Sequence, residues 1–316
     1  MRDGWRRDPP LRFPLETLDA LVQPAAPGRR VVEAIPTDGG LANTNIRLRL
    51  DDDASLLLRI PTRNPDGWAR EAALHRAMTG IAPELRHASG QSAIGRPLLI
   101  LDWIDGERLE QVAPIMPDAA LASLARTLGA TLARVHATRF AETGTLGPDL
   151  SVASPFSVGA DGLAAFLDRC LVQGRGGKRL GAPLTAAVLA LVAREGGRLD
   201  AALGSPCLVH GDFNGSNILI RAGRVAAVVD WEFAFAGDAL FDFANITRPP
   251  LGARSGFKDS LATGYRAAGG VLPMDWQRLA RLVDLYNWAD FLGRPDPGEA
   301  LIGDAKRMIE DAISLF

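Results

Sequence analysis

Acidic and amide side chains follow two apolar runs in the stretch Pro206–Asn245. The runs, Leu208–Val209 and Val225–Val229, predict short buried strands. The polar side chains that follow them are His210, Asp212 and Asn217 after the first run, and Asp230 and Glu232 after the second. Carboxylates directly after buried strands stand at a sheet edge, where sites are usually built.

A hairpin is predicted within the same stretch, because a glycine-containing turn at Arg221–Arg224 joins Ile218–Ile220 to the second apolar run. It would bring Asn217 and Asp230 side by side at one end of a small sheet. Carboxylate and amide oxygens, completed by phosphate oxygens, are ligands that Mg²⁺ prefers. Asp212, five residues before Asn217, could then take or orient the proton of a substrate hydroxyl.

This order of residues resembles the aminoglycoside phosphotransferase and choline kinase family, which has a protein-kinase-like fold. The matching residues are His210-Gly211-Asp212 with Asn217, then Asp230-Trp231-Glu232, then Gly237-Asp238 and Asp242. An HGDxxxxN motif followed by an apolar strand, DWE, GD and D is specific in combination, although a lone HxD is common. The resemblance covers about residues 31–295.

The resemblance implies an α+β, two-lobed protein-kinase-like fold. We expect a small antiparallel-sheet lobe at residues 1–105, and a larger, mostly helical lobe at 106–316. It also implies transfer of the γ-phosphate of ATP to a hydroxyl of a small molecule. Asp212 would be the base or hydroxyl orienter, and Asn217 and Asp230 would hold Mg²⁺, as in the kinase catalytic loop.

The N-terminal third predicts the sheet. Alternating and apolar runs, separated by turn residues, predict strands at 31–36, 44–50, 55–60, 84–88 and 97–101, with helices at 15–22 and 68–78. A turn containing Gly39 and Gly40 lies between the first two strands. Glycine lets backbone N–H groups approach phosphates closely, and Gly39, Gly40 and Asn43 match a GG-x-x-N pattern of the family.

Kinase-like proteins carry a cation on the third strand that pairs with the ATP phosphates, usually a lysine. This chain has three lysines, Lys178, Lys258 and Lys306, and none in its first 177 residues. We therefore expect Arg59 to bind phosphate, because its planar guanidinium suits phosphate geometry. Glu71, on the following helix, is the expected partner of Arg59. Arg47 and Arg49 are the alternatives to Arg59 as the phosphate-binding cation.

The segment Asp102–Gly106 follows the fifth strand and is the expected inter-lobe hinge. The resemblance implies that adenine bonds to backbone groups near Asp102, Trp103 and Ile104. Apolar residues at helical spacing then predict helices at 117–136, 163–172, 183–203, 257–268, 275–292 and 298–315, with a glycine-rich loop at 173–181.

Several further side chains have expected roles. His210 is expected to be structural, whereas His75, His87 and His136 are expected on the surface or packed. Asp238 and Asp242 should fix the loop after Asp230. The residues after Asp230 leave no room for a protein kinase's activation segment, so the acceptor should be a small molecule. Acidic and aromatic residues, including Glu232 and Trp288, suit a cationic acceptor.

Composition excludes other classes. The net charge is −2 without a basic block, so nucleic acid is not the expected partner. The N-terminus lacks a secretory apolar region and no apolar run is long enough to span a membrane, so we expect a cytoplasmic protein with no obligate protein partner. Two cysteines provide neither a disulfide framework nor a zinc site.

Three other functions are alternatives to this one. A choline or amino-alcohol kinase, or another metabolite kinase, is favoured by the acidic residue of DWE, although Phe233 stands where choline kinases commonly have tyrosine. An ATP-binding pseudoenzyme is disfavoured because Asp212, Asn217 and Asp230 are all present. A metal-dependent hydrolase would need more histidines near His210.

Overall fold

A computed structural model describes residues 11–37 and 43–316. Gly39 and Gly40 lie outside the described residues. Two compact units are present: the described part of Met1–Leu109 with Gly147–Ser151 and Ser216–Glu232, and Glu110–Leu146 with Val152–Gly215 and Phe233–Phe316. The sequence suggested consecutive domains at 1–105 and 106–316, whereas these units interleave along the chain.

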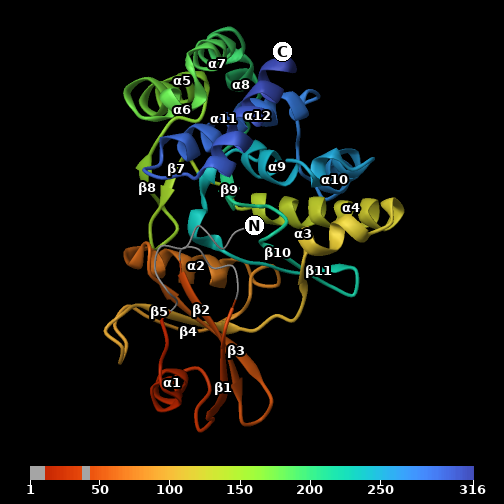
Figure 1. Cartoon of the computed structure of the whole chain (residues 1–316). Helices are drawn as coiled ribbons and strands as arrows, with labels where there is room; N and C mark the ends of the chain where they lie inside the picture. Colours follow the sequence, from red (N-terminus) through yellow and green to blue (C-terminus); the bar gives the residue numbers. More distant parts are fainter. Residues whose placement is uncertain (1–10, 38–42) are drawn as a thin grey trace. The chain divides into compact units, whose positions relative to one another are not determined.

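The first unit is built on a five-stranded antiparallel sheet with the order β1-β2-β3-β5-β4 (Figure 1). Its strands are β1 (Val31–Pro36), β2 (Asn43–Leu50), β3 (Ser55–Pro61), β4 (Leu85–Ser89) and β5 (Leu98–Asp102), and its helices are α1 (Leu15–Val22) and α2 (Trp68–Ala77). All seven elements were predicted from the sequence, with bounds within one or two residues. The predicted sheet is therefore confirmed.

The two faces of the sheet are covered by different helices, as Figure 1 shows. Side chains alternate across a strand, so Leu98 and Ile100 of β5 join the core with α1, whereas Leu99 and Leu101 pack against Ala72 of α2. Arg59 alternates with Leu58 and Ile60 of the α1 core. Its side chain consequently lies on the α2 face of the sheet.

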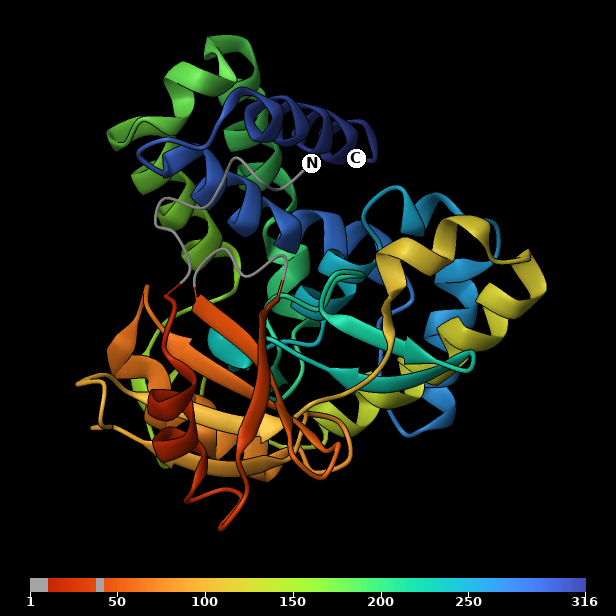
Figure 2. The same cartoon turned by 60° about the horizontal axis from the view of Figure 1, so that its bottom comes forward.

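A smaller three-stranded sheet also belongs to the first unit, with the order β11-β10-β6. Its strands are β6 (Glu107–Arg108), β10 (Ile218–Arg221) and β11 (Arg224–Val228), and Figure 2 shows β10 and β11 as a hairpin. Two contacts place the hairpin in this unit: its pairing with β6, and the hydrogen bond that Val228 N–H donates to Ile81 O (2.8 Å). The two-residue β6 has too short a pattern to be recognised in the sequence.

The second unit is mostly helical. Its helices are α3 (Leu109–Val112, beginning at the unit boundary), α4 (Asp118–His136), α5 (Ala160–Leu167), α6 (Gly176–Leu180), α7 (Ala182–Glu195), α8 (Gly197–Ala202), α9 (Leu240–Ile246), α10 (Phe257–Ala267), α11 (Trp276–Gly293) and α12 (Glu299–Ser314). A four-stranded sheet of the order β8-β7-β12-β9 joins them, formed by β7 (Gly144–Leu146), β8 (Val152–Pro155), β9 (Cys207–Val209) and β12 (Phe235–Gly237).

Two predictions for this unit were wrong in detail. The glycine-rich segment 173–181 was expected to be a loop, but part of it forms α6, because Gly176 packs closely against Leu171 and Leu292. The helix expected at 183–203 is divided into α7 and α8, where Gly196 and Gly197 lower helix propensity. In the part of the chain that the structure describes, no helix is long and apolar enough to cross a membrane.

Helices α4 and α10 cross at two glycines, Gly129 and Gly264. A methyl group on Gly264 would overlap the carbonyl oxygen of Arg126, and one on Gly129 would overlap that of Leu261. Backbone atoms cannot move aside as a flexible side chain can. The crossing therefore requires glycine on both helices.

We predict that Gly264→Ala lowers the free energy of unfolding by about 1–3 kcal/mol, because overpacking separates the two helices. Urea unfolding followed by circular dichroism measures this change. The matched control is Gly197→Ala on α8, where an added methyl group meets nothing within 4 Å and alanine should be neutral or stabilising. Equal effects of the two substitutions would contradict the prediction.

Candidate active site

Arg59 connects two acidic residues within the first unit. Its Nε lies 2.5 Å from Glu71 Oε1 on α2, and its Nη2 donates to Asp230 Oδ1 at 2.7 Å. The side chains of Arg59 and Glu71 are each only 5% exposed. The structure thus brings together the third-strand cation, its expected helix partner and the expected metal ligand after β11.

Charge and burial act together on this cluster. Burial alone would lower the pKa of Arg59, but Glu71, Asp230 and Glu232 outweigh it and raise that pKa above its ordinary value. Burial raises the pKa of Glu71, and Arg59 opposes the rise. For Glu232, burial and then Asp230 raise the pKa to about 7, against the opposing charge of Arg59. The carboxyl groups of Glu71, Asp230 and Glu232 therefore share one buried positive charge, that of Arg59.

The alternatives to Arg59 are engaged elsewhere. The guanidinium of Arg47 lies 4.8 Å from the ring centroid of Trp103 and bonds to Ser55 Oγ, whereas Arg49 pairs with Glu33 at 3.0 Å. Neither contact involves the acidic residues around Arg59. Of these three arginines, Arg59 is therefore the one that contacts Glu71 and Asp230.

Two further polar residues join the cluster. Asn43 Nδ2 donates to Glu232 Oε2 (3.3 Å), and its Oδ1 accepts from Thr62 N–H (3.2 Å). Arg70 Nη2 donates to the carbonyl oxygen of Glu232 at 2.8 Å. Asn43 was expected near the nucleotide, but Arg70 was missed. Its contact with Glu232 spans 162 positions of the chain and leaves no local signal in the sequence.

Asn217 and Asp230 meet at the open end of the β10–β11 hairpin, as the sequence predicted. Val229 N–H donates to Asn217 O (2.9 Å), and the hairpin closes at Ala222 and Gly223, both at positive φ. Asp230 itself has a φ of 69°, a conformation that aspartate tolerates better than most residues. The backbone thus turns sharply at the end of β11.

The donor set at this hairpin end fits Mg²⁺. Asn217 and Asp230 offer amide and carboxylate oxygens, and Mg²⁺ is usually bound by one or two protein oxygens together with phosphates and water. Among the described residues, no group of three or more His, Cys, Asp or Glu side chains could hold a metal alone. The set therefore suits a metal that arrives with a phosphate ligand.

Asp212 lies in the second unit, in the loop that follows β9. Its Oδ1 accepts from Asn214 Nδ2 at 2.6 Å, and its N–H donates to His210 Nδ1 at 3.2 Å. His210 is fully buried, which agrees with its expected structural role. The side chain of Asp212 is therefore oriented by residues on both sides of it in the loop.

A buried carboxylate holds the backbone of this loop. Asp242 on α9 is 0% exposed and accepts from His210 N–H (2.8 Å) and Gly211 N–H (2.9 Å). His136 Nε2 also lies 3.1 Å from Asp242 Oδ2. Asp242 was expected to fix the loop after Asp230. Instead it fixes the loop that contains Asp212, through long-range contacts that spacing does not reveal.

Gly211 has a backbone shape that requires glycine. Its φ is +79°, and a methyl group there would overlap the carbonyl oxygen of Phe233. Asn245 Nδ2 additionally donates to Gly211 O at 3.0 Å. Asp238, the other expected loop carboxylate, accepts from Leu240 N–H (2.9 Å) and Gly204 N–H (3.0 Å).

The expected adenine-binding residues are partly occupied by the sheet. Asp102 N–H donates to Glu84 O at 2.9 Å, and Trp103 N–H donates to Ser55 O at 3.3 Å. A base would consequently have to use backbone groups of Ile104 or the carbonyl oxygens of Asp102 and Trp103.

Trp288, an expected acceptor-binding residue, lies within the second unit and is 6% exposed. Its Nε1 donates to Asp284 Oδ2 at 2.8 Å, and the Arg248 guanidinium lies 4.7 Å from its ring centroid. One ring face is therefore already covered by a cation.

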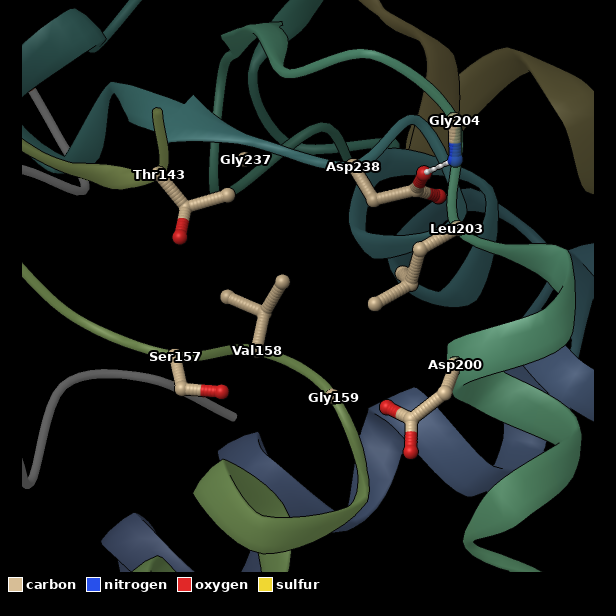
Figure 3. Close-up of a pocket in the computed structure, with 9 residues that line it drawn as sticks. All are labelled: Thr143, Ser157, Val158, Gly159, Asp200, Leu203, Gly204, Gly237 and Asp238. Atoms are coloured by element: carbon tan, nitrogen blue, oxygen red, sulfur yellow. Dashed lines mark hydrogen bonds between the residues drawn. The ribbon is translucent and has the colours of Figure 1, made fainter. Parts of the chain in front are cut away.

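The second unit also contains a pocket of about 250 Å³ (Figure 3). It is lined by Thr143, Ser157, Val158, Gly159, Asp200, Leu203, Gly204, Gly237 and Asp238. Figure 3 shows two hydroxyl groups on one side and two carboxylates, Asp200 and Asp238, on the other. Asp238 was expected to fix the loop after Asp230, not to line a pocket. The sequence did not indicate Asp200, because α8 contains no recognisable motif.

The fold and the groups around Arg59 define a class, the phosphotransferases with a protein-kinase-like fold. The chain belongs to the phosphotransferase enzyme family, whose model matches residues 33–282. Among solved structures, the aminoglycoside phosphotransferase APH(4)-Ia is similar over 95% of this chain and 98% of its own, with 17% identity and a TM-score of 0.70.

Two further relatives are similar to the chain. The macrolide 2′-phosphotransferase MphH from Brachybacterium faecium is 20% identical, with a TM-score of 0.65, over 93% of this chain and 98% of its own. A local match to hygromycin-B 4-O-kinase from Escherichia coli is 49% identical over 39 residues, which is 12% of this chain and 11% of that kinase.

Proposed function

We propose that the protein transfers the γ-phosphate of ATP to a hydroxyl group of a small, cationic molecule. The observation that carries this proposal is Arg59, which is buried and joined to both Glu71 and Asp230. A guanidinium held between a helix glutamate and a carboxylate after a hairpin suits the phosphates of a nucleotide. A thermostable mutant of APH(4)-Ia, which has this fold, was solved as a ternary complex with AMP-PNP and hygromycin B.

On the nucleotide side, Arg59 would pair with phosphate oxygens while Glu71 holds its guanidinium in place. Asn217 and Asp230 would hold Mg²⁺, which when bound supplies positive charge to the phosphates. Asn43, with Gly39 and Gly40, would contribute polar groups to the phosphate end of the nucleotide. Asp102, Trp103 and Ile104 would bind adenine through backbone groups.

On the acceptor side, Asp212 would accept a hydrogen bond from the acceptor hydroxyl and take its proton as the oxygen attacks phosphorus. The bond from the γ-phosphorus to the bridging oxygen breaks, and ADP leaves. Asp242, which bonds to two backbone N–H groups of the same loop, is a positioning residue for Asp212. Most of the rate enhancement would come from orientation and charge stabilisation.

The cationic nature of the acceptor is supported by carboxylates in each unit. Glu232 belongs to the first unit, and Asp200 and Asp238 line the pocket of the second. Trp288 would contribute an aromatic wall only if Arg248 moved from its ring. Hygromycin-B 4-O-kinase and APH(4)-Ia are named for aminoglycoside chemistry. A kinase that uses ATP in this way would act in the cytoplasm.

Release of ADP in the presence of a panel of acceptors tests the function. The panel contains hygromycin B and other aminoglycosides, a macrolide, choline, ethanolamine and neutral sugars. Turnover of an amine-bearing acceptor is the expected result. Turnover of neutral sugars alone would contradict the cationic acceptor but not the assignment as a kinase. ATP binding without any turnover would favour a pseudoenzyme.

We predict that Arg59→Ala raises the KM for ATP at least about tenfold and lowers kcat, because the phosphates lose a charge-assisted contact. Arg59→Lys should recover part of the activity, since lysine keeps the charge but not the paired geometry. Steady-state kinetics with varied ATP measures both.

Arg49→Ala is the matched control, because Arg49 pairs with Glu33 on the exposed part of the sheet. Circular dichroism must accompany the kinetics, since removing Arg59 leaves Glu71 buried without its ion pair and destabilises the fold. A folded Arg59→Ala enzyme with unchanged KM and kcat would assign phosphate binding to another cation.

A further inference from the structure

A second pocket in the helical unit is basic rather than acidic. Its volume is about 360 Å³, within the range of roughly 300–1,000 Å³ that is usual for small-molecule sites. Four segments line it: the chain after α9, the start of α10, the first half of α11 and the end of α12. The lining residues are Thr247, Pro249, Gly252, Ala253, Lys258, Gln277, Arg278, Arg281, Met308, Asp311, Ser314 and Leu315.

Two of its cations have no anionic partner among the residues that the structure describes. Lys258 makes no ion pair or side-chain hydrogen bond there. Arg278 stacks on Phe316 at 4.5 Å, and its Nε is buried without a hydrogen-bond acceptor. A buried donor without an acceptor costs free energy, so Arg278 is suited to receive an anion. The half-buried ammonium group of Lys258, which has no ion pair there, could contact the same anion.

A third cation adds to the positive field of the pocket. Arg281 is 7% exposed, and it is fixed by Asp284 (3.2 Å) and by the carbonyl oxygen of Ala244 (3.2 Å). Burial and then the charge of Arg281 lower the pKa of Lys258. An anion between these cations would relieve their mutual repulsion.

The charged side chains that line the pocket leave an excess of two positive charges. Lys258, Arg278 and Arg281 are positive and Asp311 is negative. Asp284, which does not line the pocket, pairs with both Arg281 and Arg248. Asp259 also acts on Lys258, but its side chain is exposed and solvent screens it. Pro249, Ala253, Met308 and Leu315 supply apolar wall that a simple inorganic ion would leave uncovered.

We propose that this pocket binds a small phosphate monoester, whose dianionic phosphate lies between Lys258 and Arg278 and whose organic part contacts the apolar wall. The pocket shares no residue with the groups around Arg59, and the proposal does not depend on the proposed phosphotransfer. It gives the helical unit a binding function of its own.

Calorimetric titration of the full-length protein with inorganic phosphate and with glycerol 3-phosphate tests the proposal. Glycerol 3-phosphate should bind, and Lys258→Met and Arg278→Gln should each weaken its binding at least about tenfold. Arg59→Met serves as a second arm, since it removes the other phosphate-binding cation and should leave this site intact. Lys306→Met on α12 is the matched control and should bind as the native protein does.

Circular dichroism checks that each variant is folded. If Lys258→Met unfolds, Arg278→Gln still tests the proposal, because glutamine preserves much of the side-chain packing. Two results would overturn the proposal: no binding of either probe by the native protein, or binding that survives in folded Lys258→Met and Arg278→Gln but is lost in Arg59→Met.

Discussion

Asp212→Asn should reduce kcat by about 10²–10⁴-fold, the usual contribution of a positioned general acid or base, while ATP still binds. Asparagine has nearly the same shape, and its side-chain oxygen can still accept from Asn214, which lies 2.6 Å from Asp212 Oδ1. The loop should stay in place because Asp242 holds the backbone at His210 and Gly211. The variant therefore removes the proton acceptor with little change in structure.

The measurement is kcat for the acceptor found by the ADP-release panel, together with calorimetry of nucleotide binding. Asp296→Asn is the matched control, because Asp296 is an exposed residue outside the site. A variant that keeps more than about a tenth of the native kcat has lost under roughly 1.4 kcal/mol, and Asp212 would then not be the base.

Asp230→Ala should lose magnesium-dependent nucleotide binding and activity together, with kcat/KM falling at least about 10²-fold. The carboxylate is the charged member of the expected metal-binding pair, and it is also the acceptor for Arg59 Nη2 at 2.7 Å. Its removal leaves Asn217 as a neutral ligand and Glu71 as the remaining close ion-pair partner of Arg59. Titration of nucleotide at several magnesium concentrations measures the loss.

Asp230→Asn separates charge from backbone shape. Asparagine tolerates the positive φ of 69° at this position better than alanine does, so the asparagine variant should fold normally and still lose metal-dependent binding. If both variants kept native affinity and native magnesium dependence, the metal would have to lie elsewhere.

Elements with long, clear patterns could be predicted from the sequence. The five strands of the larger sheet in the first unit and helices α4, α10, α11 and α12 lie within a residue or two of their expected bounds, because alternation and helical spacing persist over several residues. Short elements such as β6, β7 and β12 could not be predicted. They exist because tertiary pairing aligns two or three residues that show no periodicity alone.

The candidate site divides in the same way. Asp212, Asn217, Asp230 and Arg59 follow from motif and strand position, and the structure places Arg59 and Asp230 in contact. Arg70 and Asp242 required the fold, because one donates to a residue 162 positions away and the other accepts from residues 31 and 32 positions away. Such long-range contacts leave no local pattern.

The arginine of the third strand also affects how the protein can be studied chemically. A guanidinium stays protonated at any workable pH, and its proton is held further by Glu71 and Asp230. It cannot act as a nucleophile toward amine-directed reagents. Because Lys178, Lys258 and Lys306 are the chain's lysines, nucleotide analogues that acylate a lysine have no target on this sheet, and profiling reagents of that kind would leave the first unit unlabelled.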